Sequence, residues 1–241
     1  MKSRAILLLL SLSSSLLCAQ EQTAPRHTLR VLPLGDPPPF LQEVRNGVRY
    51  ELPAPEGSVP PRDLQLAATM EGKEPLKLRL RLGSASTPLT FPLPETKVIE
   101  VRNGSSTWLK IPLSTSEASL ALIWRGGPDW SKAGVMTIGD GATDRQGDCR
   151  FVNLTAKPMG LVWGKQRLKL EPRTKLLSSI PAGTEEQELS ILYSDAQGNL
   201  RPCLATKVTP KADKLQQFII YASDEKDPRT PVKVLPLEEP R

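Results

Sequence analysis

The chain has 241 residues, of which 39% are hydrophobic and 24% charged, so it is long enough for one large hydrophobic core or two small ones, and a disordered or fibrous protein is excluded. Its 24 prolines, set against 4 Phe, 3 Tyr and 4 Trp, are roughly twice the usual share of about 5% and favour short strands and turns. The formal net charge of +6 comes from interspersed residues, not from one basic tract, and the stacking motifs of nucleic-acid binders are missing, so we expect no nucleic-acid partner.

Residues 1–19 have the pattern of a secretory signal peptide. Lys2 and Arg4 form a basic start, residues 5–17 form a serine-interrupted apolar run, and Ala19 is a small residue at the expected cleavage point. The run is shorter than the roughly 20 apolar residues of a membrane-spanning helix. We therefore expect export to the periplasm or cell surface, with no transmembrane segment after signal removal. The alternative is a lipoprotein with Cys18 as its lipid-bearing first residue, although Leu17 departs from the small residue expected before such a cysteine.

Residues 20–61 are expected to form a proline-rich arm packed on the first domain. Nine prolines in this segment remove backbone donors that a central strand or a helix needs. Residues 28–32 and 47–52 alternate apolar and polar side chains like short edge strands, and Asn46-Gly47 has the chemistry of a tight hairpin turn.

The remaining chain is predicted to be all-β, with two small antiparallel β-sandwich domains of immunoglobulin-like type. Residues 62–138 form the first domain, in which the alternation of residues 76–82 predicts a half-buried strand and Asn103-Gly104 predicts a hairpin turn. Residues 139–147 hold three glycines and no large apolar side chain, so they are expected to be a linker. Residues 148–241 carry eight strand candidates, enough for a second sandwich.

Cysteine usage predicts one disulfide. Removal of the signal peptide leaves Cys149 and Cys203, an even number in an oxidising compartment. Both flank strand-like runs, so a bond between them would join two strands of the second domain. Two buried thiols are the alternative.

The sequence predicts no catalytic, cofactor or metal site. His27 is the only histidine, which argues against hydrolase triads and zinc centres. Asp140, Asp144 and Asp148 lack the alternate spacing of a calcium loop and are interpreted as turn residues. The acidic run 185–188 is interpreted as a solvated strand edge.

Trp130 is the one candidate contact residue for a ligand or partner. Trp108 and Trp124 lie in alternating strand patterns typical of a core, whereas Trp130 follows Gly-Gly-Pro-Asp in a loop.

The second half of the chain also resembles a group of uncharacterised bacterial secreted proteins. The resemblance lies in Cys149-Arg-Phe-Val-Asn-Leu-Thr155, in Leu168-Lys-Leu-Glu-Pro172 and in Phe218-Ile-Ile-Tyr221. It implies an exported all-β protein and carries no activity with it. We therefore expect a non-catalytic cell-envelope protein that binds a protein or polysaccharide, for which strand addition is a suitable mode. The alternatives are a carbohydrate-active enzyme with paired carboxylates and a purely structural envelope component.

Overall fold

The computed structural model describes residues 25–68, 75–145 and 148–240 of the chain. The predicted signal peptide and Cys18 lie outside these residues. The all-β prediction is confirmed, because the described residues form strands and a single short 3-10 helix, η1 (Ala142–Arg145). None of the helical structure in the described ranges is long and apolar enough to cross a membrane.

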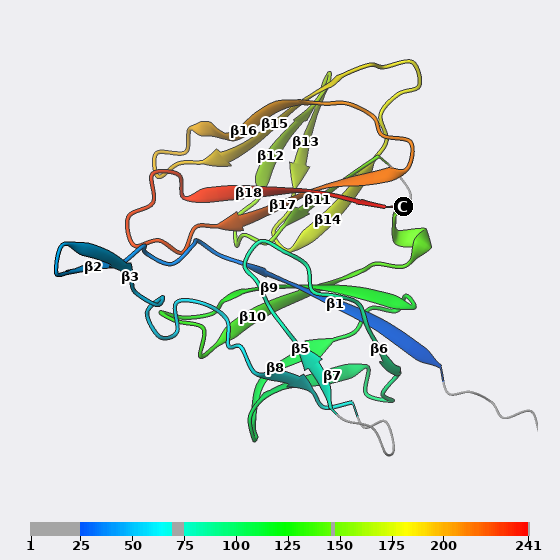
Figure 1. Ribbon diagram of the computed structural model, residues 1–241. Coiled ribbons are helices and arrows are strands. Elements are labelled where there is room, and N and C mark those ends of the chain that lie inside the picture. The colour runs from blue at the N-terminus through cyan, green and yellow to red at the C-terminus, as the bar shows by residue number, and fades with distance from the viewer. Residues whose placement is uncertain (1–24, 69–74, 146–147, 241) are drawn as a thin grey trace, which may run out of the picture.

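Two sandwiches stack into four layers of sheet (Figure 1). The outer sheet of the first sandwich has the order β5-β4-β7-β8, formed by β4 (Leu64–Leu66), β5 (Leu76–Leu78), β7 (Val98–Asn103) and β8 (Ser106–Pro112). Its inner sheet has the order β10-β9-β1-β6, formed by β1 (Arg26–Leu34), β6 (Leu89–Pro92), β9 (Ala118–Arg125) and β10 (Ala133–Gly139).

The second sandwich is built the same way. Its inner sheet has the order β14-β11-β17-β18, formed by β11 (Cys149–Asn153), β14 (Thr174–Ser178), β17 (Lys214–Ala222) and β18 (Val232–Pro240). Its outer sheet has the order β13-β12-β15-β16, formed by β12 (Met159–Trp163), β13 (Gln166–Leu170), β15 (Gln187–Ser194) and β16 (Leu200–Val208). In each inner sheet the first strand runs parallel to the penultimate one, β1 to β9 and β11 to β17, and the other pairs are antiparallel.

The two sandwiches share one strand order but differ in the length of the connection between their first two strands. The second connects its first two strands, β11 and β12, through residues 154–158, whereas the first connects β1 to β4 through residues 35–63. This longer connection contains the separate hairpin of β2 (Gln42–Arg45) and β3 (Val48–Glu51). The hairpin is thus an insertion into a scaffold that is complete without it.

Three cores hold the layers together. Each sandwich has its own core between its two sheets, and a third core lies between the two inner sheets. The third core contains buried side chains from both sandwiches: Leu32, Leu34, Leu120, Leu122 and Ile138 from the first, and Val152, Leu154 and Ile219 from the second. Strands buried on both faces need continuous apolar runs, which explains why β9 and β17 lack a strict alternation.

Strand β1 differs from its prediction as an edge strand, because it lies between β9 and β6 in the inner sheet. Pro33 is accommodated because β6 pairs with β1 only as far as Leu29. Beyond that point the Gly83 amide donates to the Pro33 carbonyl at 2.9 Å. The N and C=O of one strand residue point to the same side, so the missing N–H of Pro33 faces Gly83 and costs no bond to β9.

Both predicted hairpin turns are present. Asn46 and Gly47 have φ values of 52° and 78°, as the two-residue turn between β2 and β3 requires, and Gly104 turns the chain between β7 and β8 with a φ of 59°. The strand predicted over residues 76–82 is shorter: β5 ends at Leu78, and an isolated bridge joins Arg81 to Ser84.

The predicted Cys149–Cys203 disulfide is wrong, since neither cysteine is disulfide-bonded. Cys149 lies on β11 in the inner sheet and Cys203 on β16 in the outer sheet. The register of β15 with β16 shifts at Ile191, which leaves Cys203 as the extra residue of a bulge. Its thiol donates to the Ile191 carbonyl at 3.3 Å, within its own sheet. The alternative of two thiols therefore holds.

Candidate interaction site on the proline-rich arm

The hairpin projects from the body of the molecule (Figure 1). Its backbone pairs only with itself among the described residues. A two-stranded hairpin has marginal stability alone in water. Here the turn chemistry of Asn46-Gly47 and an exposed ion pair at 2.7 Å between Glu43 and Arg45 support it.

Large apolar side chains are concentrated on this hairpin. Of the eight that stand exposed among the described residues, six lie within residues 40–52: Phe40, Leu41, Val44, Val48, Tyr50 and Leu52. Val44 is 63% exposed and Val48 53%, although both belong to strands. Neither face of the hairpin rests on the scaffold. An apolar surface gathered on one projecting element is typical of an interaction site.

A buried aspartate fixes the point where the arm leaves the scaffold. The Asp36 carboxylate accepts hydrogen bonds from the Ser223 hydroxyl at 2.5 Å and the Asp224 amide at 2.8 Å, and it forms an ion pair with Lys233. Burial alone would raise the pKa of Asp36, but the bonds from Lys233 and Ser223 lower it to about 2. The Asp36 amide in turn donates to Asp224, which also pairs with Arg125 at 3.0 Å. The arm is therefore anchored to the second sandwich.

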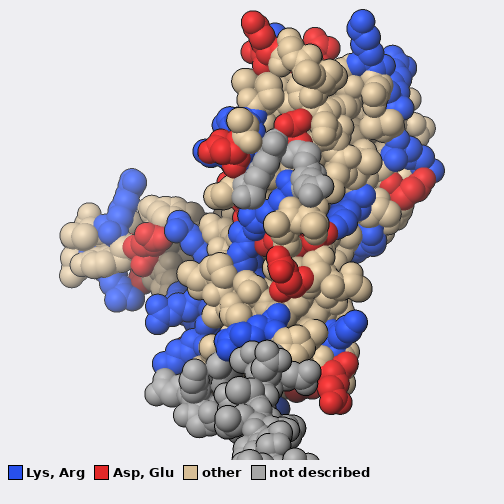
Figure 2. Space-filling model, turned by 90° about the vertical axis from the view of Figure 1, so that its right-hand side faces the viewer, with Lys and Arg blue, Asp and Glu red and all other residues tan. Residues whose placement is uncertain are grey.

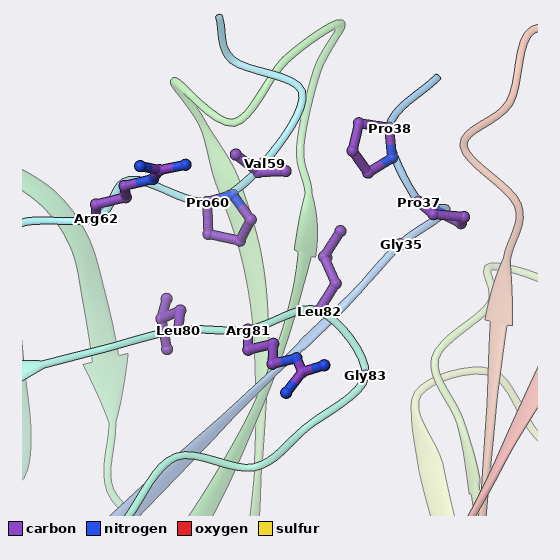
Figure 3. Close-up of a pocket in the computed structure, with 10 residues that line it drawn as sticks. All are labelled: Gly35, Pro37, Pro38, Val59, Pro60, Arg62, Leu80, Arg81, Leu82 and Gly83. Carbon is purple, nitrogen blue, oxygen red and sulfur yellow. The ribbon is translucent and has the colours of Figure 1, made fainter. Parts of the chain in front are cut away.

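A groove of about 440 Å³ lies at the base of the arm (Figure 3). Its lining comes from the start of the arm, its return and the segment after β5: Gly35, Pro37, Pro38, Val59, Pro60, Arg62, Leu80, Arg81, Leu82 and Gly83. Figure 3 shows Leu82 between Pro60 and the Pro37–Pro38 pair, with the two arginine side chains at the margins. The side chains of Arg62 and Arg81 are exposed, and neither guanidinium group makes a hydrogen bond or ion pair within the described ranges. An apolar group that carries a carboxylate matches this lining.

Most other sheet edges are protected. The edge strands β6, β8, β16 and β18 contain Pro92, Pro112, Pro202 and the pair Pro236 and Pro240. A proline cannot donate to an added strand, so it blunts such an edge. β5 has only three residues, β10 contacts β8, and β13 contacts β14. By contrast, β2 and β3 contain no proline and keep both outer edges open.

A second charged cluster lies between the sandwiches, but it is structural. Asp140 accepts from Arg30 at 2.6 Å and from Arg145 at 3.0 Å, and Arg150, which is fully buried, lies 3.4 Å away. Burial lowers the pKa of Arg150, while the neighbouring Asp140 opposes that shift. Glu239 of β18 binds Arg30 from the other sandwich at 2.5 Å. Each of these charged side chains has an oppositely charged neighbour, so the cluster joins the two sandwiches and is not free to bind a ligand.

The tryptophan prediction is wrong. Trp130 is only 2% exposed and belongs to the core of the first sandwich. Its amide donates to the Gly57 carbonyl at 2.9 Å, and its carbonyl accepts from the Trp108 indole at 2.7 Å. The loop position was read correctly, but the residue packs into the core and contributes only a small part of its surface to the hollow that it lines with Trp108 and Asp129.

The remaining candidates also have structural partners. His27 is buried, its Nε2 lies 2.8 Å from the Ser119 hydroxyl, and burial lowers its pKa. Asp144 pairs with Lys175 at 3.3 Å, and Asp148 accepts from the Ile180 amide at 2.6 Å. In the acidic run, Glu186 pairs with Lys207 at 2.7 Å on the surface. Sequence reasoning predicted the Asn46-Gly47 turn, but it assigned the residues of β1 to the arm and missed the exposed apolar side chains, which only the packing reveals.

On the face shown in Figure 2, basic and acidic side chains are interspersed. This face therefore has no charged patch of one sign that would suggest a binding site other than the arm. No protein-family model matches the chain, and no curated protein matches it either.

Proposed function

We propose that this is an exported, non-catalytic protein of the cell envelope that binds another polypeptide through its hairpin arm. The observation that carries the proposal is the insertion itself: two sandwiches share one strand order, and only the first adds a hairpin with apolar side chains in solvent. Binding residues are commonly placed on loops held by a rigid scaffold. Export rests on the signal-peptide pattern of residues 1–19.

A polypeptide fits the arm better than a polysaccharide does. The open edges of β2 and β3 offer backbone donors and acceptors, and the neighbouring Val44, Val48 and Leu52 offer aliphatic surface. Sugars favour exposed aromatic platforms. Of the six exposed apolar side chains of residues 40–52, four are aliphatic, and only Phe40 and Tyr50 are aromatic. Trp130 and Trp163 are buried, and the Trp124 ring is covered by the Arg173 guanidinium at 4.1 Å.

The carboxylates also support a binding role. Asp36 and Asp224 have pKa values shifted in opposite directions, a pattern that occurs in acid–base pairs. Here, however, Asp36 is engaged by Ser223, Lys233 and two backbone amides, and Asp224 by Arg125. These contacts favour an anchor for the arm over a pair of catalytic groups.

Site-specific photocrosslinking in the native host tests this proposal. A photoreactive amino acid replaces Val44 on the hairpin or, as the matched control, Leu200 on β16; both side chains are 63% exposed. We expect adducts with polypeptide from position 44 and none from position 200. Equal labelling from both positions, or no adduct from position 44 in a protein with unchanged thermal unfolding, would contradict arm-mediated binding and favour a purely structural component.

A further inference from the structure

We infer that the outer edge of β3 pairs with β3 of a second copy of this chain, antiparallel, about a two-fold axis at Tyr50. The inference rests on the proposed function, in which the arm is the docking element, and it names the partner of one of the arm's edges. The sequence from Val48 to Leu52 carries the argument, because it is self-complementary in that arrangement and in no neighbouring one.

The backbone of β3 has the required orientation. The Leu52 amide donates to the Leu41 carbonyl at 2.9 Å, so these two residues form a hydrogen-bonded pair. Hydrogen-bonded and non-hydrogen-bonded pairs alternate along an antiparallel ladder. Tyr50 is therefore the next residue of β3 whose backbone N–H and C=O groups face β2. The N–H and C=O groups of Arg49 and Glu51 therefore face away from β2. No other strand of the described residues pairs with them.

Charge selects the register. With the two-fold axis at Tyr50, Arg49 lies opposite Glu51 of the second copy, and the same pair recurs on the other side of the axis. Centring the pairing on Arg49 would oppose two arginines, and centring it on Glu51 would oppose two glutamates. Like charges directly opposite each other destabilise a sheet, whereas opposite charges stabilise it. Only the arrangement about Tyr50 avoids like-charge pairs and forms two ion pairs.

The apolar side chains match in the same register. Tyr50 meets Tyr50 of the second copy in a non-hydrogen-bonded pair, where Cα atoms lie about 4.5 Å apart and side chains are close. Val48 lies opposite Leu52 of the second copy on the same face. These three side chains are exposed in the single chain, between 36% and 53%. Cross-strand packing against the second copy removes part of this apolar surface from water.

The edge of β2 is less suited to self-pairing. A two-fold axis at Glu43 opposes two glutamates, and an axis at Val44 uses Glu43 and Arg45, which already pair with each other within the chain. The β2 edge and the basal groove therefore stay available to another partner. An interface of five residues per copy is small, so we expect a weak dimer that depends on protein concentration.

Charge exchange tests the inference directly. We expect sedimentation velocity of the full exported protein to show a monomer–dimer equilibrium. R49E and E51R each place like charges opposite one another, so each should weaken dimerisation about tenfold or more. An equimolar mixture of the two single variants recreates two opposite-charge pairs, as does the double variant R49E/E51R, and both should dimerise like the wild type. Unchanged thermal unfolding of every variant checks the fold.

A covalent readout fixes the position of the axis. In a Cys203→Ser background, in which Cys149 is fully buried, Tyr50→Cys should give a disulfide-linked dimer on mild oxidation, and the matched variant Val44→Cys on β2 should not. A wild type that stays monomeric at high concentration, or a dimer that ignores both charge exchanges, would overturn the inference. In either case, adducts between position 44 and another polypeptide would leave the proposed function standing, so the two failures can be told apart.

Discussion

Asp36 is the residue at which the arm and the second sandwich meet, and its ionisation has a measurable consequence. Its folded-state pKa of about 2 lies below the ordinary value of 3.8, so the anchor stabilises the fold above about pH 4 and loses this effect as the pH falls toward 2. We expect Asp36→Asn to lower the free energy of unfolding by roughly 2 kcal/mol at pH 7. Urea unfolding of both proteins between pH 2 and pH 7 measures the difference. A gap that did not shrink toward pH 2 would contradict this assignment.

The cysteines give a second prediction at the scale of single residues. Burial raises the pKa of the Cys203 thiol to about 11, and Cys149 is fully buried in the same core. Thiolates are the reactive form, so the native protein should resist iodoacetamide at pH 8. Denaturation without reductant should let both react, giving two carbamidomethyl groups by mass spectrometry of the chain without its signal peptide. If neither cysteine were modified after denaturation, the two would be disulfide-bonded and the original prediction would be correct.

At the scale of elements, a Gly→Val substitution should affect stability in one hairpin turn and partner binding in another. Gly47 and Gly104 both have positive φ values and open space around the position of a Cβ atom, so a valine at either position strains only the backbone. Gly104 joins β7 to β8 in the first core, and Gly104→Val should destabilise the protein by about 1 to 2 kcal/mol. Gly47→Val should leave the unfolding midpoint unchanged but abolish adducts from position 44. A fall in midpoint for Gly47→Val would mean that the hairpin supports the scaffold.

The positions of the strands were predictable from the sequence, whereas the number of faces that each strand buries was not. The eight strand candidates of residues 148–241 correspond to β11 to β18, and the alternation is regular in β12 because this strand belongs to an outer sheet with one solvated face. β1 was predicted to be an edge strand because the surrounding residues 20–61 are rich in proline, whereas it lies between two cores. The arm's turn at Asn46-Gly47 followed from local chemistry. The exposure of Val44 and Tyr50 did not, because an alternating strand looks the same whether or not another layer covers it.

At the scale of the whole molecule, we expect the two sandwiches to unfold as one cooperative structure, although each has its own core. Separating them would expose the third core, and each large apolar side chain there contributes about 1.5 to 3 kcal/mol by burial. Separation would also uncover the fully buried Arg150, whose guanidinium donates to the Gly139 carbonyl at 2.9 Å and to Gln217 at 2.8 Å. A state with one folded and one unfolded sandwich is therefore strongly disfavoured.

Adjacent residues of β17 provide the test of this coupling. Ile219 is buried in the third core and Ile220 in the core of the second sandwich. Either substitution by alanine should cost about 2 to 5 kcal/mol, because each leaves a cavity. We expect Ile220→Ala to lower hydrogen-exchange protection of β7 and β8 in the first sandwich as much as that of β15 in the second, although it contacts only the second core. If β7 and β8 kept their wild-type protection while β15 lost it, the sandwiches would unfold separately and the third core would be a weak contact. In that case Ile219→Ala should lower the free energy of unfolding less than Ile220→Ala does. In a cooperative molecule the two substitutions should lower it by similar amounts, within the spread that cavities cause.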